Sequence, residues 1–234
     1  GPNPREWWSY VMTSRDGGYT WSKPVRLTQA LGPIKNKAIL RQDGTLLCPS
    51  SLETSSSWTC VMERVDLQEL VNSPEQTQWT SVVVPIDETE YADLIQPTLL
   101  IHPDALQILM RSKQGVLYQS WSQDEGKTWS TAMPTELPNP NSGVDAVTLT
   151  DGRHVLIYNP TCPEPGNWGG PRTPLVAAVS TDGTTWRDFL VLEDQPGRYS
   201  YPAVIQGRDG MIHVAYTYDR KSMAVVDIVP AEIH

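Results

Sequence analysis

The sequence is poor in positive charge and has no long apolar run. Its 234 residues carry 18 Lys and Arg against 27 Asp and Glu, a formal net charge of −9, and the basic residues form no run. This balance argues against an electrostatic grip on nucleic acid or on an anionic membrane. No apolar stretch approaches the roughly 20 residues that a membrane-spanning helix needs. We therefore expect neither a nucleic acid nor a membrane as a partner.

Cysteine is scarce, and its number is odd. The chain has three cysteines, Cys48, Cys60 and Cys162, and an odd count argues against a disulfide framework. Cys48 and Cys60 could face each other across a hairpin and form a single bridge. The alternative, which we favour, is three small thiols that are buried or half-buried.

Motifs for metal, phosphate and serine-nucleophile chemistry are absent as well. The four histidines, His102, His154, His213 and His234, show no metal-ligand spacing, and we interpret the first three as ordinary strand or turn residues. No glycine-rich phosphate loop follows a predicted strand, and no G-x-S-x-G is present. The sequence therefore predicts no metal ion and no cofactor.

What the sequence does have is a repeated turn motif. It reads "SRDGGYTW" at residues 14–21, "SQDEGKTW" at 122–129 and, in a shortened form, "STDGTTW" at 180–186. A decayed copy ends at Trp79. The tryptophans of the four copies recur roughly every 55 residues, and a period of that size indicates stacked units that cannot bury their faces alone.

Each unit reads as four short strands. In residues 95–130, four runs rich in β-branched, aromatic and leucine residues are separated by turns of Pro, Gly and Asp. Two more units, 33–86 and 143–192, have the same pattern. Residues 7–28 contain two strands and 201–229 three, and only "DLQELV" suits a helical turn. Four-stranded units of about 50 residues are the blades of a β-propeller, so we predict an all-β fold of four-stranded antiparallel blades.

The motif itself is best explained as a structural turn between the third and fourth strands of a blade. Asp16 and Asp124 can accept hydrogen bonds from backbone N–H groups of their own turn. Gly18 and Gly126 supply a positive φ, and the tryptophan of each copy is expected to pack between blades. One carboxylate per turn is far short of the six to eight oxygens that calcium prefers, so we do not interpret the turns as calcium sites.

These turns resemble the Asp-box, or BNR repeat, of sialidases and sialidase-like propellers. Longer stretches carry the resemblance further, among them "GPIKNK" (32–37), "IQPTLL" (95–100) and "YSYPAVIQGRDGMIHVAYTYDR" (199–220). They are similar to the BNR-repeat, exo-sialidase-like proteins of microbes over essentially the whole chain. The resemblance implies a propeller, and it implies a glycoside hydrolase whose substrate is a carbohydrate ending in an acidic sugar.

The resemblance also implies an incomplete domain. Sialidase-like catalytic domains have six blades, whereas the predicted strands make about four to five. Residues 1–2 match the remnant left by a tag-removing protease, so we expect 3–234 to be one propeller domain that lacks N-terminal strands, and the compartment stays open. Two outcomes are then expected for the edge strands. Either 7–28 pairs with the blade at 199–229 in a smaller ring, or the chain self-associates through open edges.

In a propeller, ligands bind in a funnel lined by the starts of the innermost strands and by the loops that join second and third strands, which is an expectation from the fold alone. Polar, cationic and aromatic residues at these positions suit an anionic sugar, because Arg binds carboxylates with two hydrogen bonds and aromatic rings stack on pyranose faces. The predicted funnel residues are Lys35, Asn36, Lys37, Glu53, Gln96, Arg111, Lys113, Asn141, Ser142, Asp145, Asn159, Trp168, Arg172, Tyr199, Tyr201, Asp219 and Arg220.

Sialidases bind the substrate carboxylate with three arginines and use a tyrosine nucleophile paired with a glutamate, together with an aspartate as acid and base. The resemblance implies that Arg172 is one of these arginines and that Tyr199 is the nucleophile. Arg111 stands a few residues before the expected second arginine. Gln96 stands where the glutamate partner is expected, and an amide cannot act as a base. A phenol with a pKa near 10 needs a base or cations beside it to become a nucleophile.

Two functions follow for the chain. The first is a sialidase-like glycoside hydrolase that acts on a terminal sialic or uronic acid. Its catalytic candidates are Tyr199, Glu53 and Asp145, and its predicted substrate-binding residues are Lys35, Lys37, Gln96, Arg111, Asn141, Ser142, Arg172, Tyr201 and Arg220. The second is a carbohydrate-binding or scaffold propeller without catalysis, which the glutamine at position 96 favours.

Overall fold

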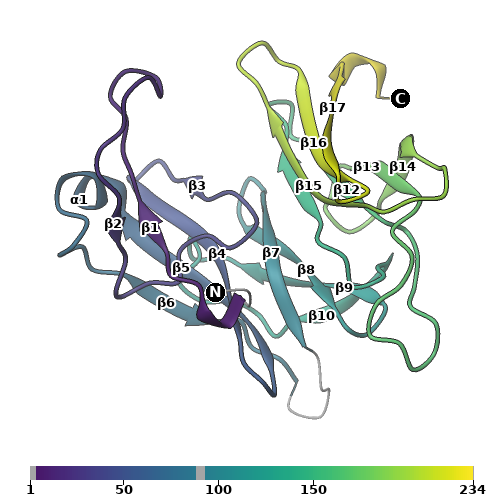
Figure 1. Ribbon diagram of the computed structural model, residues 1–234, viewed down its shortest axis with the longest axis horizontal. Coiled ribbons are helices and arrows are strands. Elements are labelled where there is room, and N and C mark those ends of the chain that lie inside the picture. The colour runs from purple at the N-terminus through teal and green to yellow at the C-terminus, as the bar shows by residue number, and fades with distance from the viewer. Residues whose placement is uncertain (1–3, 88–92, 234) are drawn as a thin grey trace.

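The structure is a computed structural model that describes residues 4–87 and 93–233. It is an all-β fold in which five antiparallel sheets follow one another in chain order around an arc (Figure 1). The prediction of a propeller built from antiparallel blades is confirmed. Among the described residues, none of the helices has the length and apolarity that a membrane crossing requires.

Three of the sheets are complete four-stranded blades, and the other two have two and three strands. The two-stranded sheet pairs β1 (Tyr10–Val11) with β2 (Val25–Arg26). The first complete blade holds β3 (Ile39–Leu40), β4 (Thr45–Glu53), β5 (Trp58–Asp66) and β6 (Thr80–Val83). The second holds β7 (Leu94–Ile101), β8 (Leu106–Ser112), β9 (Val116–Ser122) and β10 (Met133–Pro138). The third holds β11 (Asp145–Thr148), β12 (His154–Tyr158), β13 (Leu175–Ser180) and β14 (Arg187–Glu193), and the last sheet holds β15 (Tyr199–Gln206), β16 (Ile212–Tyr218) and β17 (Ser222–Ile228).

The helical content is small. The short helix α1 (Leu67–Asn72) follows β5, where the sequence allowed a single helical turn. It begins at Asp66, whose carboxylate accepts a hydrogen bond from the Glu69 N–H at 2.8 Å and so caps the first turn. Two 3-10 segments, η1 (Pro4–Glu6) and η2 (Pro230–Glu232), lie near the two ends of the described chain.

The core lies between successive blades. Leu47 and Met62 of the first complete blade pack with Leu106 and Ile108 of the second, and all four are essentially inaccessible to solvent. The interface of the second and third blades and that of the third blade with the last sheet are packed in the same way. The three complete blades and the last sheet therefore bury their faces against one another, which is why the units need their neighbours.

The repeated motifs form turns held by their own hydrogen bonds, as predicted. In the copy at 122–129, the Asp124 carboxylate accepts the Thr128 N–H at 2.8 Å and the Thr128 hydroxyl at 2.6 Å, while Ser122 Oγ accepts the Gly126 N–H at 2.9 Å. The copies at 14–21 and 180–186 form the corresponding backbone bonds. Each turn therefore satisfies its own backbone donors. The expectation that the tryptophan of every copy packs between blades is wrong for Trp21, which is 57% exposed because the two-stranded sheet beside it has no complete blade to cover it.

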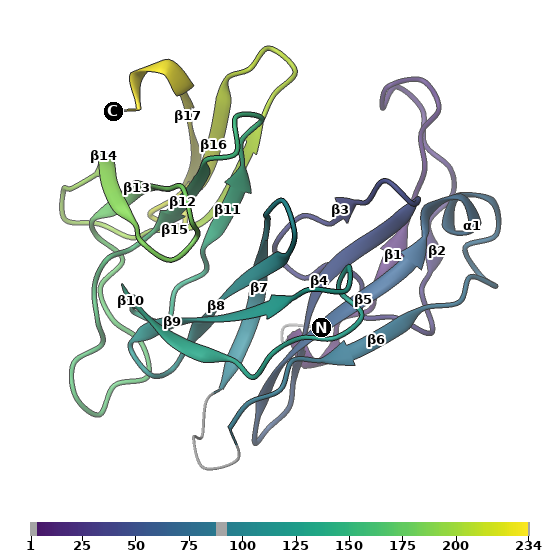
Figure 2. The same ribbon diagram turned by 180° about the vertical axis from the view of Figure 1, so that it is seen from behind.

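The sheets do not close into a smaller ring. In the described chain, the strands at 7–28 pair only with each other, and β15–β17 form a sheet of their own. Figures 1 and 2 show these two sheets at opposite ends of the arc. The predicted pairing of 7–28 with 199–229 is therefore wrong, because three packed blades set a curvature that holds the two end sheets apart. Self-association through the edges stays a prediction.

The prediction of free, buried or half-buried thiols is correct for Cys48 and Cys60 and wrong for Cys162, which is exposed. Cys48 and Cys60 are free and buried, while Cys162 is free and exposed. In the β4–β5 register Cys48 lies opposite Glu63, and Cys60 lies opposite Ser51. The two thiols therefore do not face each other, and the alternative of a bridge is wrong. Burial raises the pKa of the Cys48 thiol to about 12.

Candidate functional site

In each of the last four sheets, a residue with left-handed backbone conformation lies just before the innermost strand or near its start. Lys35, Gln96, Asn141 and Tyr201 have φ values of 73°, 56°, 54° and 53°, which non-glycine residues rarely adopt. In β7 and β15 these residues sit at shifts of the pairing register, between Ile95 and Thr98 and between Ser200 and Ala203. A β-bulge of this kind re-aims a side chain, so the side chains of Gln96 and Tyr201 depart from the regular alternation of their strands.

The side chains of Lys35, Gln96 and Tyr201 come together around Gly143. A Cβ atom built on Gly143 would stand 3.0 Å from Lys35 Cε, 3.1 Å from Tyr201 Cδ1 and 3.5 Å from Gln96 Oε1. Side chains from three different sheets therefore converge on one glycine, and any larger residue there would push them apart. The expectation that the starts of the inner strands line one funnel fits this convergence.

Tyr201 is held between two arginines. Arg111, at the end of β8, and Arg172, in the β12–β13 loop, both lie near enough to its phenol to favour the ionised form, and the Arg172 guanidinium carbon lies 5.3 Å from the ring centroid. Burial alone would raise the pKa of Tyr201. The charge of Arg111 and the polar interaction with Arg172 outweigh burial, so the pKa of Tyr201 lies below its ordinary value.

The two arginines keep donors to spare. Arg111 is only 6% exposed, yet among the described residues its Nε and Nη1, like Nη1 of Arg172, have no hydrogen-bond partner. The buried acceptors Gln96 Oε1 and Asn141 Oδ1 are also unpaired. Buried polar atoms without partners are rare in folded proteins because each costs free energy. Such a set of guanidinium donors is what a carboxylate would satisfy.

At the rim of the funnel, the predicted residues Lys113 and Trp168 lie near two residues that sequence reasoning missed, Trp58 and Asp93. Asp93 accepts the Trp58 N–H at 2.8 Å and the Lys113 ammonium at 2.7 Å. The ammonium lies 4.2 Å from the Trp58 ring centroid. A hollow beside this cluster is lined by Thr54–Ser57, Trp58, Lys113 and the exposed Trp168. The one sequence signal for this cluster is the position of Trp58, directly after the predicted loop at Glu53.

Among the residues that the structure describes, the Glu53 carboxylate forms no hydrogen bond or ion pair. Glu53 ends β4, is half-buried, and lines a second hollow together with Lys35 and Ser51. Burial lowers the pKa of the Arg111 guanidinium, and the negative charge of Glu53 opposes that effect. In the described part of the chain, no group of three or more His, Cys, Asp or Glu residues is arranged to hold a metal ion.

The comparison with protein families decides the relationship. A family described as "BNR repeat-like domain" matches residues 1–214. The chain belongs to the BNR repeat-like domain family. No curated protein matches this BNR-repeat chain.

Solved structures share the fold of this BNR-repeat chain. The NanB sialidase of Streptococcus pneumoniae matches with a TM-score of 0.64 and 17% identity, over 97% of this chain and 36% of NanB. An intramolecular trans-sialidase of Ruminococcus gnavus matches with a TM-score of 0.64 and 18% identity, over 97% and 51%. A Dyadobacter fermentans protein of unknown function matches with a TM-score of 0.68 and 17% identity, over 93% and 62%. The chain thus spans less than two thirds of each of these proteins.

The BNR-repeat chain places Tyr199 outside the funnel, contrary to the sequence-based expectation. Tyr199 is 1% exposed and belongs to the core between the third blade and the last sheet, with its ring 5.1 Å from that of Tyr218. Burial raises its pKa to about 12. Residues two apart in a regular strand share a face, but the bulge between Ser200 and Ala203 separates Tyr199 from Tyr201. Tyr201, expected only to bind substrate, is the tyrosine of the funnel.

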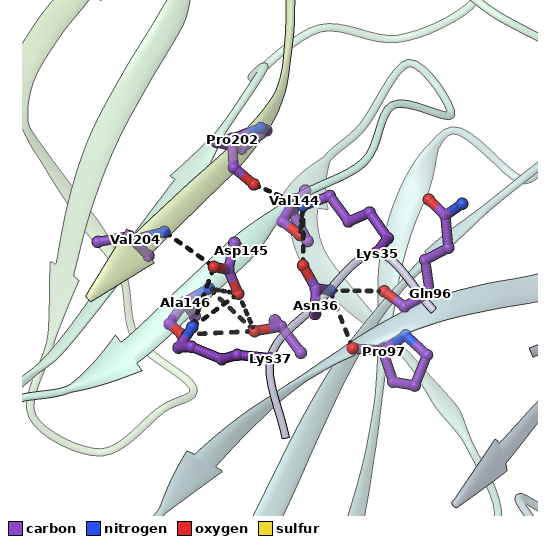
Figure 3. A network of polar contacts seen from close by, with 11 residues as sticks. Lys35, Asn36, Lys37, Gln96, Pro97, Val144, Asp145, Ala146, Pro202 and Val204 are labelled. Carbon is purple, nitrogen blue, oxygen red and sulfur yellow. Dashed lines mark hydrogen bonds and ion pairs between the residues drawn. The ribbon is translucent and has the colours of Figure 1, made fainter. Parts of the chain in front are cut away.

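Asp145 is also unsuited to the catalytic part that the sequence suggested. Asp145 is 2% exposed, and its carboxylate accepts hydrogen bonds from Lys37 at 3.0 Å and from the Val204 N–H at 2.9 Å (Figure 3). The Thr98 hydroxyl also donates to it, at 2.8 Å. The Ala146 N–H donates to it as well, at 2.9 Å. A carboxylate with this many donors links the inner strands of three sheets. The Lys37 ammonium is an ion-pair partner of Asp145 and is not left for a ligand.

Three further predicted residues differ in how far their polar groups are already engaged by the protein. Ser142 is buried and donates to Asn159 Oδ1 at 2.7 Å, so its hydroxyl is engaged in the fold. Asn141 donates to the Trp168 carbonyl at 2.8 Å and offers only its unpaired oxygen to a ligand. Arg220 is exposed in the β16–β17 turn, after Asp219, whose carboxylate accepts the Arg198 N–H.

Proposed function

We propose that this chain carries the acidic-sugar site of a sialidase-like glycoside hydrolase. Arg111 and Arg172 bind the carboxylate of a terminal sialic or uronic acid, and Tyr201 is the nucleophile. The observation that carries the proposal is the Tyr201 phenol between two guanidinium groups that have unpaired, buried N–H donors. Two cations beside a phenol favour its ionised form, which is the nucleophilic form.

The chemistry follows from this arrangement. The sugar carboxylate takes the free donors of Arg111 and Arg172, which sets the anomeric carbon beside the Tyr201 oxygen. The phenolate oxygen forms a bond to that carbon while the glycosidic C–O bond breaks, and the leaving oxygen takes a proton from an acid. Water then forms a bond to the anomeric carbon while the sugar–tyrosine bond breaks, which releases the Tyr201 phenolate, and the proton of the water returns to the group that acted as the acid. Glu53 is the carboxylate on the funnel side and the candidate for proton transfer in this chain.

The similar structures support the proposal through what their names state. NanB is a sialidase, the Ruminococcus gnavus protein is an intramolecular trans-sialidase in complex with oseltamivir carboxylate, and a Trypanosoma rangeli sialidase is in complex with the inhibitor DANA. An anionic sugar as the ligand agrees with the cationic funnel of this chain.

A second candidate function is sugar binding without catalysis. Gln96 lies beside Tyr201 above Gly143, at the place where the resemblance expects a glutamate. An amide cannot take the phenol proton, so only the two arginines would activate Tyr201. If they are insufficient, the site binds an acidic sugar and releases it unchanged.

Binding and turnover measured side by side test the two functions. The methyl glycosides of sialic acid and glucuronic acid serve for calorimetry, and the corresponding 4-methylumbelliferyl glycosides for turnover, with both this chain and the full-length natural protein. We expect binding that Arg111→Ala abolishes, and turnover that falls roughly 100-fold or more in Tyr201→Phe but not in Tyr199→Phe. Binding without turnover in the full-length protein would favour the second function, and absence of binding to either sugar would refute both.

A further inference from the structure

Lys35 connects parts of the chain that belong to three different sheets. Its ammonium donates hydrogen bonds to Val144 O at 2.6 Å, to Pro202 O at 2.7 Å and to the neighbouring Asn36 Oδ1 at 2.8 Å (Figure 3). Pro202 lies in β15 and follows Tyr201 directly, while Val144 immediately precedes β11. A side chain before β3 therefore fixes the backbone on both sides of the funnel.

The geometry uses every proton of the ammonium. A lysine ammonium has three N–H donors and no acceptor, whereas the neutral amine has two N–H groups and a lone pair. Three acceptors surround Lys35 Nζ, so the neutral amine would leave one of them unpaired and would point its lone pair at an oxygen. The full set of bonds exists only in the protonated state.

Tyr201 depends on such an anchor. Its φ of 53° and the bulge around it are conformations that the rest of the structure must hold in place. Lys35 bonds the carbonyl of the very next residue, and the Lys35 stem and the Tyr201 ring flank Gly143 together. Losing that bond frees the bulge that directs the phenol toward Arg111 and Arg172.

We propose that the Lys35 ammonium is the positioning group that holds Tyr201 between Arg111 and Arg172. The inference rests on the proposed function for its use, but the position of Tyr201 can be observed without any sugar. Lys35 is a positioning residue rather than a catalytic one, because its three donors are spent on the protein itself.

The charges around Lys35 make this position sensitive to pH. Burial lowers the pKa of Lys35 to about 7; Asp145 on β11 opposes that effect, and Lys37 and Arg111 add to it. As pH rises through about 7, the ammonium loses a proton and one of its three bonds. The Tyr201 bulge is therefore held below this pH and loosened above it.

Carbon-13 NMR of the free protein tests the proposal. With tyrosine labelled at Cζ and lysine at Cε, the Tyr201 signal, assigned through Tyr201→Phe, should shift between pH 5 and 8.5 with the same midpoint as the Lys35 signal. In Lys35→Met this pH-dependent change of the Tyr201 signal, called the Tyr201 step below, should vanish. The spectrum of this variant at pH 6 should resemble that of the wild type at pH 8. The affinity for the methyl glycoside of sialic acid should fall about tenfold between pH 6 and 8, as expected for one lost bond to a charged group.

Two control variants test whether the Tyr201 step belongs to Lys35 and not to another group that titrates in the same pH range. Lys127→Met removes an exposed lysine of the turn at 122–129 and should leave the Tyr201 step unchanged. His213→Asn removes a group on β16 whose pKa Asp227 raises, and the step should persist in this variant too. A Tyr201 signal without a step at the Lys35 midpoint, in the wild type alone, overturns the proposal even if Lys35→Met does not fold. Loss of sugar binding with the step intact would count against the proposed function instead.

Discussion

At the scale of single residues, the site depends on which of two tyrosines faces the funnel. Tyr199 and Tyr201 lie two positions apart in the same strand, and the pattern "YSYP" gives no reason to separate them. The bulge that separates them is held by Lys35, 167 positions from its partner Pro202. Sequence reasoning could therefore name the funnel residues Lys35, Gln96 and Arg172, but not which tyrosine they surround, because a non-local contact decides it.

Arginine geometry at the site gives a prediction. Arg111→Lys keeps the positive charge but loses the planar donor set that binds two carboxylate oxygens. We expect the affinity for methyl sialoside to fall by about 2 kcal/mol, or roughly 30-fold, as measured by calorimetry. Arg15→Lys, an exposed arginine in the turn at 14–21, is the matched control and should bind like the wild type. Equal affinities of the two variants would contradict bidentate binding at Arg111.

At the scale of elements, local chemistry explains why the blades were predictable. The Ser, Asp, Gly and Thr of each repeated turn bond one another within a few residues, so the motif is visible in the sequence and recurs in the structure. The Asp145 hub is the opposite case. Its donors come from Lys37, Thr98 and Val204, which only the assembled blades bring together. The sequence therefore suggested a catalytic role for a carboxylate that links strands of different sheets.

The tryptophans of the turns should differ in their contribution to stability. Trp129 is 6% exposed and packs with Leu47 and Leu106 between two blades, whereas Trp21 is 57% exposed. We expect Trp129→Ala to lower the free energy of unfolding by about 3–5 kcal/mol, the usual range for a buried aromatic, and Trp21→Ala to change it by less than about 0.5 kcal/mol. Urea denaturation measures both. Similar losses in the two variants would contradict packing between blades as the reason for the repeat.

The carboxylates of the turns predict a dependence of stability on pH. Hydrogen bonds from the Thr128 hydroxyl and N–H lower the pKa of Asp124 to about 2. Because the folded pKa lies below the unfolded value of about 3.9, the stabilisation is complete above that value and is lost as pH falls toward 2. Asp124→Ala should cost about 1 kcal/mol at pH 7 and flatten the decrease of Tm between pH 4 and 2. A variant with an unchanged acid slope would contradict this, and ligand affinity should not change.

At the scale of the whole molecule, the arc leaves edges and apolar side chains uncovered. Trp8, Tyr10 and Tyr19 in and beside β1 are 62%, 55% and 90% exposed, and Val225 in β17 at the other end of the arc is 70% exposed. Unpaired strand edges invite pairing with another chain, and edge lysines prevent it. We expect this chain to form dimers or larger species that Tyr10→Lys together with Val225→Lys reduces to monomers, as measured by light scattering. A monodisperse wild-type monomer would refute self-association.

In the proposed mechanism, Tyr201 attacks an acidic sugar held by Arg111 and Arg172, and covalent labelling reports on this bond itself. With a sialosyl fluoride carrying a second fluorine at C3, or the corresponding fluoroglucuronosyl fluoride, the Tyr201 oxygen bonds to the anomeric carbon and fluoride leaves without needing an acid. The proposed mechanism predicts that peptide mass spectrometry finds one sugar on Tyr201, with labelling lost in Tyr201→Phe and Arg111→Ala and kept in Tyr199→Phe. Labelling of Tyr199, or no label on Tyr201 under conditions where the sugar binds, would contradict it.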